Sequence, residues 1–493
     1  MPTIAKNTAY LTIASVGQKL FSFIYFSLLA RFLGVEQIGL YATVLSFTTI
    51  FLVLVDMGFT PILIREGARD KNKISKILGQ VLSSKLIFGL LTYLILSLVI
   101  YFIRGHYLNP QEFQKLIAIM GVSMVLNSFS TTLYGALRSF QNLRYEAASI
   151  IFSQLVIVIS GLGFLWWTKS IFLLFVALGL GDIFGICFSS YVLWKKYNVR
   201  PKFIWDKALF KYIFILAVPF ALAGVFTKVY SAIDHVLLSY ILGTKQVGFY
   251  SIPSKIAFAF QFIPIAFAAA LYPAMSYFFV QDKTRLKTIF EKGLFYLAMI
   301  ALPISFGVIA IADVFITKVY GTQFQPSILP LKILVASLIF AFLDFPIGSL
   351  LNACNLQRIQ TSAMGISMIL NIIFNLILIP KFGVIGAALA AFLTNFILAA
   401  IGYFYIPKIV TLPNWSFWGK ILKIFLCSAL MGLLVVLIKQ QLLGFLQPLG
   451  FIHTLIFLSI LIISGGLFYL AFLWIFRVLR KEEVEEFIDI IKR

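Results

Sequence analysis

Charged side chains are scarce in this chain of 493 residues, at 12% of the sequence. Soluble globular proteins carry roughly 25% charged residues, so this chain cannot cover a water-facing surface. Hydrophobic residues make up 61%, and phenylalanine alone contributes 52 residues. The scarcity of charge excludes a soluble protein and predicts an all-α polytopic membrane protein.

Cysteine is also rare, and motifs for chemistry are missing. The three cysteines, Cys187, Cys354 and Cys427, lie in apolar stretches without a C-x-x-C pair, which argues against disulfides and a metal site. No G-x-x-x-x-G-K-[ST] motif occurs, which argues against ATP-driven transport within this chain. Every predicted loop is short, which leaves no room for a soluble catalytic domain. We therefore expect no enzyme, no metal and no bound cofactor, and coupling to a proton or a sodium ion stays open.

Apolar runs long enough to cross a bilayer occur about fourteen times. The first is too long for a cleavable signal segment, so we expect it to be retained. The predicted spans are residues 9–33, 38–63, 77–103, 114–137, 146–168, 171–194, 212–242, 247–278, 288–317, 328–353, 359–379, 383–406, 418–438 and 450–476.

The net charge of +22 is distributed unevenly over the two sides of these spans. Of 40 lysines and arginines, 27 fall on one side and 9, Lys439 among them, on the other. Because positive loops stay in the cytoplasm, the first side is predicted to be cytoplasmic, with both termini there. Basic residues confined to short gaps between apolar runs indicate membrane topology rather than nucleic-acid binding. The tail RKEEVEEFIDIIKR at 480–493 has helical spacing and is predicted to lie on the membrane surface.

A short motif occurs twice, as RFLGVEQIGLY at 31–41 and YILGTKQVGFY at 240–250. Five residues are identical, each 209 positions after its counterpart: Leu33 and Leu242, Gly34 and Gly243, Gln37 and Gln246, Gly39 and Gly248, Tyr41 and Tyr250. GALRSFQNLR at 135–144 and GSLLNACNLQ at 348–357 match at a similar offset. We infer a parallel repeat of six spans: residues 1–196 as one lobe, 197–410 as the second, and 411–493 as two further helices with a tail. The glycines predict a tight hairpin rather than a binding site.

LARFLGVEQIGLYATVLSF, LVDMGFTPILIREGA, SAIDHVLLSYILGTKQVGFYSIPSKI and ILIPKFGVIGAALAAFLTNF carry a family resemblance. The chain resembles the polysaccharide-repeat exporters and Wzx-type oligosaccharide flippases of the MATE-like exporter superfamily. The resemblance implies two six-helix lobes in a V that turn lipid-linked oligosaccharide from the cytoplasmic to the outer leaflet. Many Wzx-type members have twelve spans, so the extra pair leaves the peptidoglycan-precursor branch open. Implied partners are the lipid-linked oligosaccharide, membrane lipids, and a polymerase and glycosyltransferases of the same pathway.

Lysines inside the spans are candidates for binding such a substrate, because a charge at the bilayer centre usually faces a cavity or a partner. The 209 offset aligns Lys19 with Lys228 and Ser22 with Ser231, and predicts that the two lysines face each other across a central axis. His235 shares the Lys228 helix face. Two ammonium groups with hydroxyls suit a diphosphate; the alternative is that each lysine only pairs with an acid such as Asp56 or Asp234.

The remaining candidate site residues fall into three groups. Lys85 and Lys255 lie nearer span ends, where we expect snorkelling, and Lys255 is also a candidate for the cavity mouth. The acids at depth are counter-ion or coupling-ion candidates: Asp56, Asp182, Asp234 and Asp344. Candidates for capturing a lipid headgroup at the inner leaflet are Arg65, Arg69, Arg138 and Arg144, with a solvated basic loop as the alternative.

Competing functions would need structural features that the sequence does not predict. An ion-coupled drug antiporter of the same superfamily would favour an acidic cavity for cationic drugs, and the predicted cavity is basic. A membrane glycosyltransferase or polymerase would need a sizeable outer loop with acidic residues, and the sequence has none. The favoured function is a lipid-linked oligosaccharide flippase in the cell membrane, working by alternating access.

Overall fold

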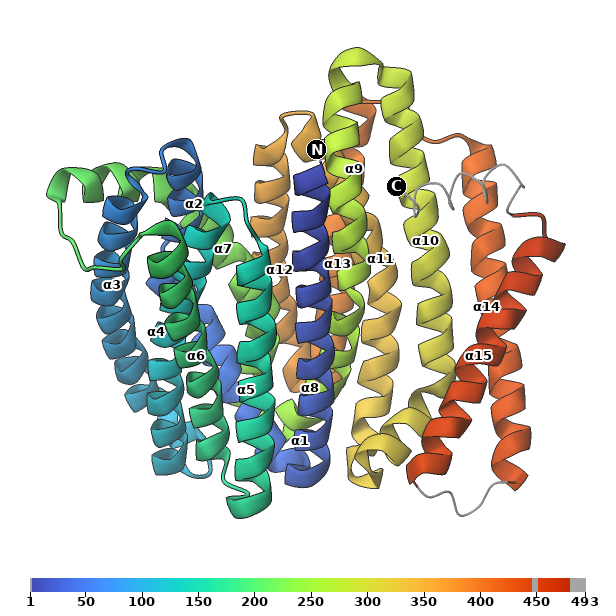
Figure 1. The fold of residues 1–493 in the computed structure, drawn as a ribbon. Coiled ribbons are helices and arrows are strands. Elements are labelled where there is room, and N and C mark those ends of the chain that lie inside the picture. Colours follow the sequence, from blue (N-terminus) through green and yellow to red (C-terminus); the bar gives the residue numbers. More distant parts are fainter. Residues whose placement is uncertain (1, 446–450, 479–493) are drawn as a thin grey trace. The chain divides into compact units, whose positions relative to one another are not determined.

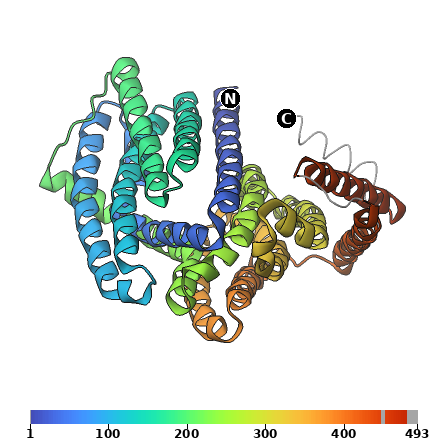
Figure 2. The ribbon, with the colours of Figure 1, turned by 90° about the horizontal axis from the view of Figure 1, so that it is seen from below.

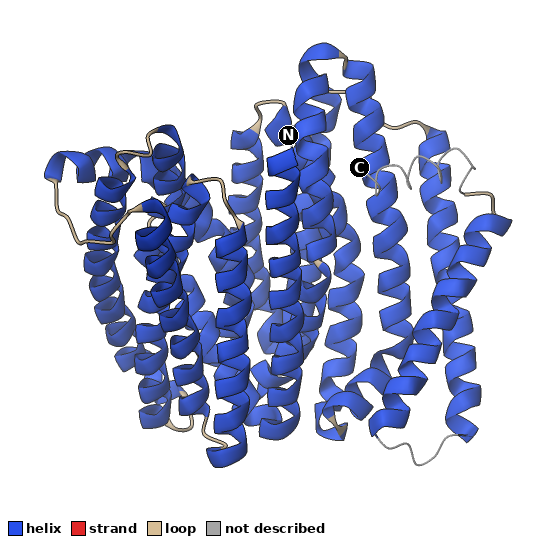
Figure 3. Ribbon diagram, in the orientation of Figure 1, coloured by secondary structure: helices blue, strands red, loops and turns tan. Residues whose placement is uncertain are grey.

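The computed structural model describes residues 2–445 and 451–478. Regular structure within these residues is helical throughout (Figure 3). Thirteen described stretches are long and apolar enough to cross a membrane, and the first, Tyr10–Asp56, contains two of the predicted spans. The prediction of an all-α protein with about fourteen spans is therefore confirmed. The predicted surface helix at 480–493 lies outside the described residues.

The chain forms two compact units, and each is described by itself. The first unit runs to Ser251 and also takes Asn371–Gly383 from later in the chain. Its helices, labelled in Figure 1, are α1 (Pro2–Asp56), α2 (Phe59–Arg69), α3 (Ile74–Ile103), α4 (Pro110–Ser139), α5 (Arg144–Thr168), α6 (Ile171–Tyr197), α7 (Lys207–Leu242), the start of α8 (Thr244–Phe260) and the end of α12 (Gln357–Phe382), with the short turn η1 (Arg104–His106).

The second unit contains Ile252–Leu370 and the residues from Val384 onward. Besides parts of α8 and α12, its helices are α9 (Phe262–Gln281), α10 (Lys283–Val314), α11 (Ile328–Ala353), α13 (Val384–Phe404), α14 (Trp415–Phe445) and α15 (Phe451–Ile475), with the short turns η2 (Phe315–Tyr320), η3 (Thr322–Ser327) and η4 (Ile406–Lys408). The division into lobes at residues 196 and 410 stays a prediction.

Helix α1 is two helices joined at Gly34. This residue has φ 80° and ψ −179°, a backbone conformation that glycine adopts without a steric penalty. Figure 2 shows the two parts of α1 meeting at an angle. Gly243, between α7 and α8, has nearly the same conformation, with φ 86° and ψ 168°. The prediction that a helix ends at each of these glycines is confirmed, and the hairpin role stays a prediction.

The two copies of the repeated motif pack directly against each other. A Cβ atom on Gly39 would overlap the carbonyl oxygen of Thr244, and one on Gly248 would overlap that of Val35. Val35 and Thr244 are themselves separated by the repeat offset, so each half supplies one glycine and one oxygen. The contact is therefore symmetric, and it depends on glycine at both positions. We call this contact of Val35, Gly39, Thr244 and Gly248 the glycine clasp.

The connection between α6 and α7 is fixed along the start of α3. Ile204 N donates to the Gly79 carbonyl at 3.4 Å, and Asp206 N donates to Gln80 Oε1 at 2.7 Å. The Asp206 carboxylate caps α7 by accepting from the Ala208 and Leu209 amides, and it pairs with Lys76 at 2.7 Å. The Lys76 ammonium holds the pKa of Asp206 below its usual range. These contacts fix where α7 begins.

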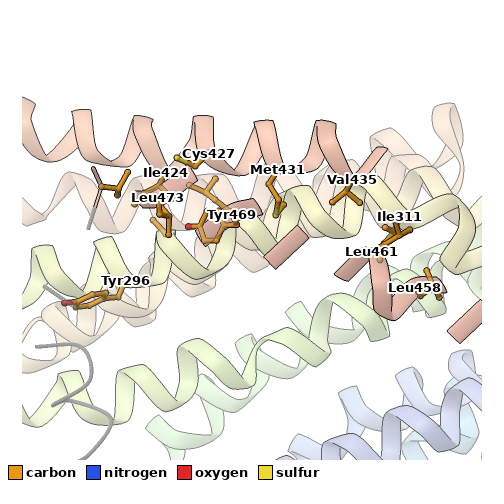
Figure 4. Packing of buried hydrophobic residues seen from close by; sticks show 14 of the residues in the cluster. Tyr296, Ile311, Ile424, Cys427, Met431, Val435, Leu458, Leu461, Tyr469 and Leu473 are labelled. Atoms are coloured by element: carbon orange, nitrogen blue, oxygen red, sulfur yellow. The ribbon is translucent and has the colours of Figure 1, made fainter. Parts of the chain in front are cut away.

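The C-terminal helix pair packs on α10 through one apolar face. Ile424, Cys427, Met431 and Val435 recur every three or four residues along α14 and meet buried residues of α15 and α10 (Figure 4). Lys439 fixes the C-terminal part of α14 to α10, because its Nζ contacts the Asp313 carboxylate at 2.7 and 2.8 Å and the Ala310 carbonyl at 2.7 Å. Its assignment to an outer loop was wrong: its side chain is buried inside α14.

Candidate functional site

A buried ion pair ties α3 to the end of α1. Lys85 is fully buried, and its Nζ forms a salt bridge with the Asp56 carboxylate. The same ammonium donates to Thr60 Oγ1 at 2.9 Å and to the Ser128 carbonyl at 3.2 Å, while Thr60 Oγ1 donates to Asp56 at 2.7 Å. The expectation that Lys85 snorkels was wrong, because its side chain points into the helix bundle and satisfies all three donors there.

Lys228 belongs to the surroundings of this ion pair. It is half-buried on α7, and its charge acts on the Asp56 carboxylate. Ser231 Oγ donates to the Lys228 carbonyl at 3.0 Å, so Ser231 lies one turn further along the same helix face. Lys19 is exposed on α1 and Ser22 is half-buried. The predicted pairing of Lys19 with Lys228 across an axis stays a prediction.

Asp234 lies in a network of neutral donors. Tyr250 Oη donates to Asp234 Oδ2 at 2.8 Å, and Asn375 Nδ2 donates to Asp234 Oδ1 at 2.8 Å. Asn371 completes the group, one turn before Asn375 on α12, and its Oδ1 accepts from Asn375 at 3.2 Å. The His235 ring packs edge-on against Tyr250, with centroids 5.0 Å apart. The side chains that donate to this carboxylate within the described residues are neutral, whereas Asp56 pairs with the Lys85 ammonium.

Asn375 supplies an unused oxygen to this network. Its side chain is fully buried, and within the described residues its Oδ1 has no hydrogen-bond partner. A carboxylate with a nearby carboxamide oxygen offers the hard oxygen ligands that small cations prefer. The group of Asp234, Tyr250, Asn371 and Asn375, which we call the α7–α12 polar network, can therefore hold a proton or a small cation.

The other two deep acids are separate from both groups. Asp182 on α6 accepts from Asn127 Nδ2 of α4 at 2.9 Å. Asp344 on α11 belongs to the second unit, and within the described residues its Oδ1 is buried without a hydrogen-bond partner. Lys255, on the part of α8 that belongs to the second unit, is half-buried. Their roles as coupling-ion, counter-ion or cavity residues stay predictions.

The four predicted headgroup-binding arginines are already engaged with protein groups to different extents. Glu66 accepts from Arg65 at 2.9 Å and from Arg69 at 3.2 Å. Arg138 Nε contacts both oxygens of the fully buried Glu146, at 2.8 and 2.9 Å. Arg144 lies over the Tyr145 ring at 4.9 Å. Arg69 is the most exposed member of the two ion pairs, with 66% of its side chain accessible.

An apolar groove of about 480 Å³ lies in the second unit between α10, α14 and α15. Its walls include Met299, Pro303, Met431 and Tyr469, and its glycines, Gly307, Gly465 and Gly466, leave room where side chains would fill it. Met431, Leu461 and Tyr469 are seen along this boundary in Figure 4. A groove with this lining suits a hydrocarbon chain.

Comparison with known proteins then decides the family. The family model described as polysaccharide biosynthesis protein matches residues 4–279, more than half of the chain. The chain belongs to the polysaccharide biosynthesis protein family. A second model, MatE, matches residues 219–377 of this family member. The predicted resemblance to polysaccharide exporters of the MATE-like superfamily is confirmed.

Relatives of this polysaccharide biosynthesis protein cover most of its length. A Haloferax volcanii protein named as a probable low-salt glycan biosynthesis flippase is 23% identical over 99% of both chains. The capsular polysaccharide biosynthesis protein CapF of Staphylococcus aureus is 20% identical over 82% of this chain and 99% of its own. The lipid II flippase MurJ, in an inward closed conformation, has the same fold, with a TM-score of 0.76, 19% identity, and coverage of 94% and 98%.

Sequence reasoning found charges in the spans of this polysaccharide biosynthesis protein but missed most of their partners. Lys85 was misplaced, and the roles of Tyr250, Asn371 and Asn375 around Asp234 were not predicted. A usable signal was present for the two asparagines, because carboxamides four residues apart in an apolar span lie on one helix face. In the sequence, Tyr250 stands out only as part of the repeated motif.

Proposed function

We propose that this chain is a flippase that moves a polyprenyl-diphosphate-linked oligosaccharide from the cytoplasmic to the outer leaflet, for cell-surface polysaccharide biosynthesis. The observation that carries the proposal is the match to a named glycan biosynthesis flippase over 99% of both chains. The structure supports it with the two chemistries that such an amphipathic substrate needs. The first unit has lysines in its spans, and the second has an apolar groove.

Each part of the substrate has a candidate partner in this proposal. The diphosphate contacts Lys19 and Lys228 of the first unit, with Ser22, Ser231 and His235 as further polar groups. Lys255, in the second unit, is proposed separately as a substrate-binding residue. The prenyl chain occupies the groove between α10, α14 and α15, whose apolar lining suits a hydrocarbon chain. Exposed Arg69 is the best placed of the four arginines to meet a headgroup first. Flipping makes and breaks no covalent bond, so the chain acts as a transporter rather than an enzyme.

The setting of the proposed transport follows from the charge distribution. The 27 cations on one side and 8 on the other, once Lys439 is left out, favour a multi-pass protein of the cell membrane with both termini in the cytoplasm. The two repeated halves favour alternating access by rocking of two lobes, residues 1–196 and 197–410. Glycosyltransferases would supply the substrate and a polymerase would consume the product.

Lysine substitution tests the substrate cavity. Lys19→Ala and Lys228→Ala are each expected to slow flipping of a lipid-linked oligosaccharide by roughly 10-fold or more, because a charge-assisted hydrogen bond to phosphate contributes about 1.5–3 kcal/mol. The measurement is the rate at which a fluorescent substrate changes leaflet in proteoliposomes. Lys169→Ala is a matched control, because Lys169 is the C-cap residue of α5 and is not one of the proposed cavity residues. Wild-type rates for both cavity variants would contradict the proposed cavity.

A second candidate, transport of a peptidoglycan precursor, is favoured by the fold match to MurJ. Both substrates share a polyprenyl diphosphate and differ in the attached group. Proteoliposomes supplied separately with lipid II and with a lipid-linked oligosaccharide distinguish them, and the proposed function expects faster flipping of the oligosaccharide. Faster flipping of lipid II would move the assignment to the second candidate.

The α7–α12 polar network is our proposed coupling-ion site. Asp234→Asn keeps the shape of the side chain but removes the carboxylate, so we expect it to abolish stimulation of flipping by a sodium or proton gradient. Flipping rates with and without each gradient measure this, and the ion whose gradient stimulates the wild type is the coupling ion. Asp313→Asn, at an acid that pairs with Lys439 and is not a coupling-ion candidate, is the control. Equal gradient stimulation in wild type and Asp234→Asn would show that Asp234 is only structural.

A further inference from the structure

Two adjoining hollows open on the first unit at the turn between α3 and α4. The larger has a volume of about 1040 Å³ and the smaller about 260 Å³. Asn109 and Glu112, at the start of α4, line both hollows, so the two share a wall. The charge distribution predicts that this face is external, on the side opposite the basic loops. None of the groups proposed above for substrate or ion binding lies here.

The larger hollow contains two cations beside exposed aromatic rings. Arg104 Nη1 donates to Gln114 Oε1 at 2.5 Å, and its guanidinium lies 4.5 Å from the centroid of the Tyr101 ring. These contacts hold the guanidinium in one place. Lys115, one turn into α4, is exposed and also lines the hollow. Two cations on adjacent helix ends form a site suited to a diphosphate.

An apolar track leads from this hollow along α3. Tyr101 and Phe102, both in the wall of the hollow, are 54% and 73% exposed. Leu98 and Leu94, which are 58% and 64% exposed, continue the track at helical spacing from Phe102. A hydrocarbon chain lying on this face would have its polar head at Arg104 and Lys115.

The smaller hollow has the composition of a carbohydrate site. Glu36 and Gln37 come from the second part of α1 and are exposed, and Thr244 comes from the start of α8. Asn109 Nδ2 donates to Glu112 Oε2 at 3.3 Å, which leaves further acceptor and donor positions on both groups. Carboxylates repel a second phosphate but accept hydrogen bonds from hydroxyl groups. The hollow therefore favours a neutral, hydroxyl-rich ligand over an anion.

Aromatic side chains form a rigid floor beneath these polar groups. The Tyr107 and Phe113 rings are stacked with centroids 3.9 Å apart, and Tyr107 Oη is 3.2 Å from Ser239 Oγ on α7. Both aromatic residues line the smaller hollow and are buried. The floor thus links α4 and α7 and cannot be displaced by a small rotation of one side chain.

We propose that the two hollows form a docking site for the flipped product, a polyprenyl diphosphate sugar in the outer leaflet. The prenyl chain lies along α3, the diphosphate contacts Arg104 and Lys115, and the first sugar enters the smaller hollow between Glu36, Gln37 and Glu112. The order of apolar, cationic and hydroxyl-binding surfaces matches the order of the three parts of the molecule. The proposal rests on the proposed function and adds a place where the product is held before release.

Photo-crosslinking tests the site without requiring transport. Gln111, on the rim of the larger hollow, is replaced by p-benzoylphenylalanine in the full chain in lipid nanodiscs. Trp166, which is 91% exposed at the end of α5 and outside both hollows, is replaced in the same way as the control. With radiolabelled polyprenyl diphosphate N-acetylglucosamine as the probe, we expect labelling at position 111 but not at 166. Arg104→Gln with Lys115→Gln should reduce it about 10-fold.

Competition separates the product from an ordinary lipid. Excess unlabelled probe should prevent labelling at position 111, whereas excess phosphatidylglycerol should not. Equal competition by phosphatidylglycerol would identify an anionic lipid site and overturn the proposal, as would equal labelling at positions 111 and 166. Flipping of the same probe is measured separately in proteoliposomes. Selective labelling without flipping would count against the proposed function alone, and flipping without selective labelling against the docking site alone.

The sugar half of the proposal has its own readout. Wild-type protein should bind polyprenyl diphosphate N-acetylglucosamine more tightly than bare polyprenyl diphosphate. Glu36→Ala with Gln37→Ala should remove that preference while leaving the affinity for the bare diphosphate unchanged. A preference that survives both substitutions would show that the sugar does not enter the smaller hollow.

Discussion

Gly248→Ala is expected to prevent the first unit from assembling, and Gly39→Ala should do the same. Each added methyl group would overlap a main-chain carbonyl oxygen, that of Val35 for Gly248 and that of Thr244 for Gly39. An overlap with main chain can be relieved only by separating the two helices, which would open the glycine clasp. We expect little folded protein by size-exclusion chromatography in detergent, and flipping below detection in proteoliposomes.

Gly163→Ala is the matched control for the clasp. Gly163 also lies in a membrane-spanning helix, α5, but a Cβ atom there would meet no atom within 4 Å. Alanine is favoured over glycine in a helix by about 1 kcal/mol, so this variant should fold at least as well as the wild type. If Gly248→Ala folded and flipped substrate as well as Gly163→Ala, the close packing of the two motifs would not be needed.

Asp56→Asn should cost about 3 kcal/mol of stability, because it leaves the fully buried Lys85 ammonium without its counter-charge. The second substitution Lys85→Met should recover most of the loss, since it removes the stranded charge while keeping an unbranched side chain of similar length. Thermal unfolding of the purified protein, followed by tryptophan fluorescence in detergent, measures both effects.

The ion pair of the second unit provides the comparison for this result. Asp313→Asn removes the counter-charge of Lys439, but Asp313 is 46% exposed, so we expect a smaller loss of stability. Asp56→Asn would also separate its two predicted roles. A stable variant that has lost coupling to an ion gradient would make Asp56 a coupling site rather than the counter-ion that its contacts with Lys85 and Thr60 indicate.

Much of the fold could be predicted from the sequence, because membrane spans are recognisable as long apolar runs. The break in α1 at Gly34 could also be predicted, because glycine within a helical pattern marks a backbone conformation that other residues rarely adopt. The contact between the two copies of the motif could not be predicted. The 209 offset showed that Gly39 and Gly248 are equivalent, but equivalence in a repeat says nothing about whether two positions touch.

The site was less predictable, because a charge in a span identifies a constraint but not its partner. Lys85 was expected to snorkel from its place near a span end, whereas the break between α1 and α2 brings Asp56 and Thr60 to it. Asp234 was recognised, but its hydrogen-bonding partner Asn375 lies 141 positions away on α12. Pairing at that separation depends on the tertiary fold, which no local pattern in one sequence encodes.

The glycine clasp also restricts sequence divergence between the two halves of this chain. Where two side chains crowd each other, a larger residue on one can be compensated by a smaller residue on the other. Here the crowding group is a carbonyl oxygen, which every amino acid carries, so no substitution at Val35 or Thr244 can make room. After the duplication that the repeat implies, the two glycines could not drift independently, while the surrounding motif residues were free to diverge.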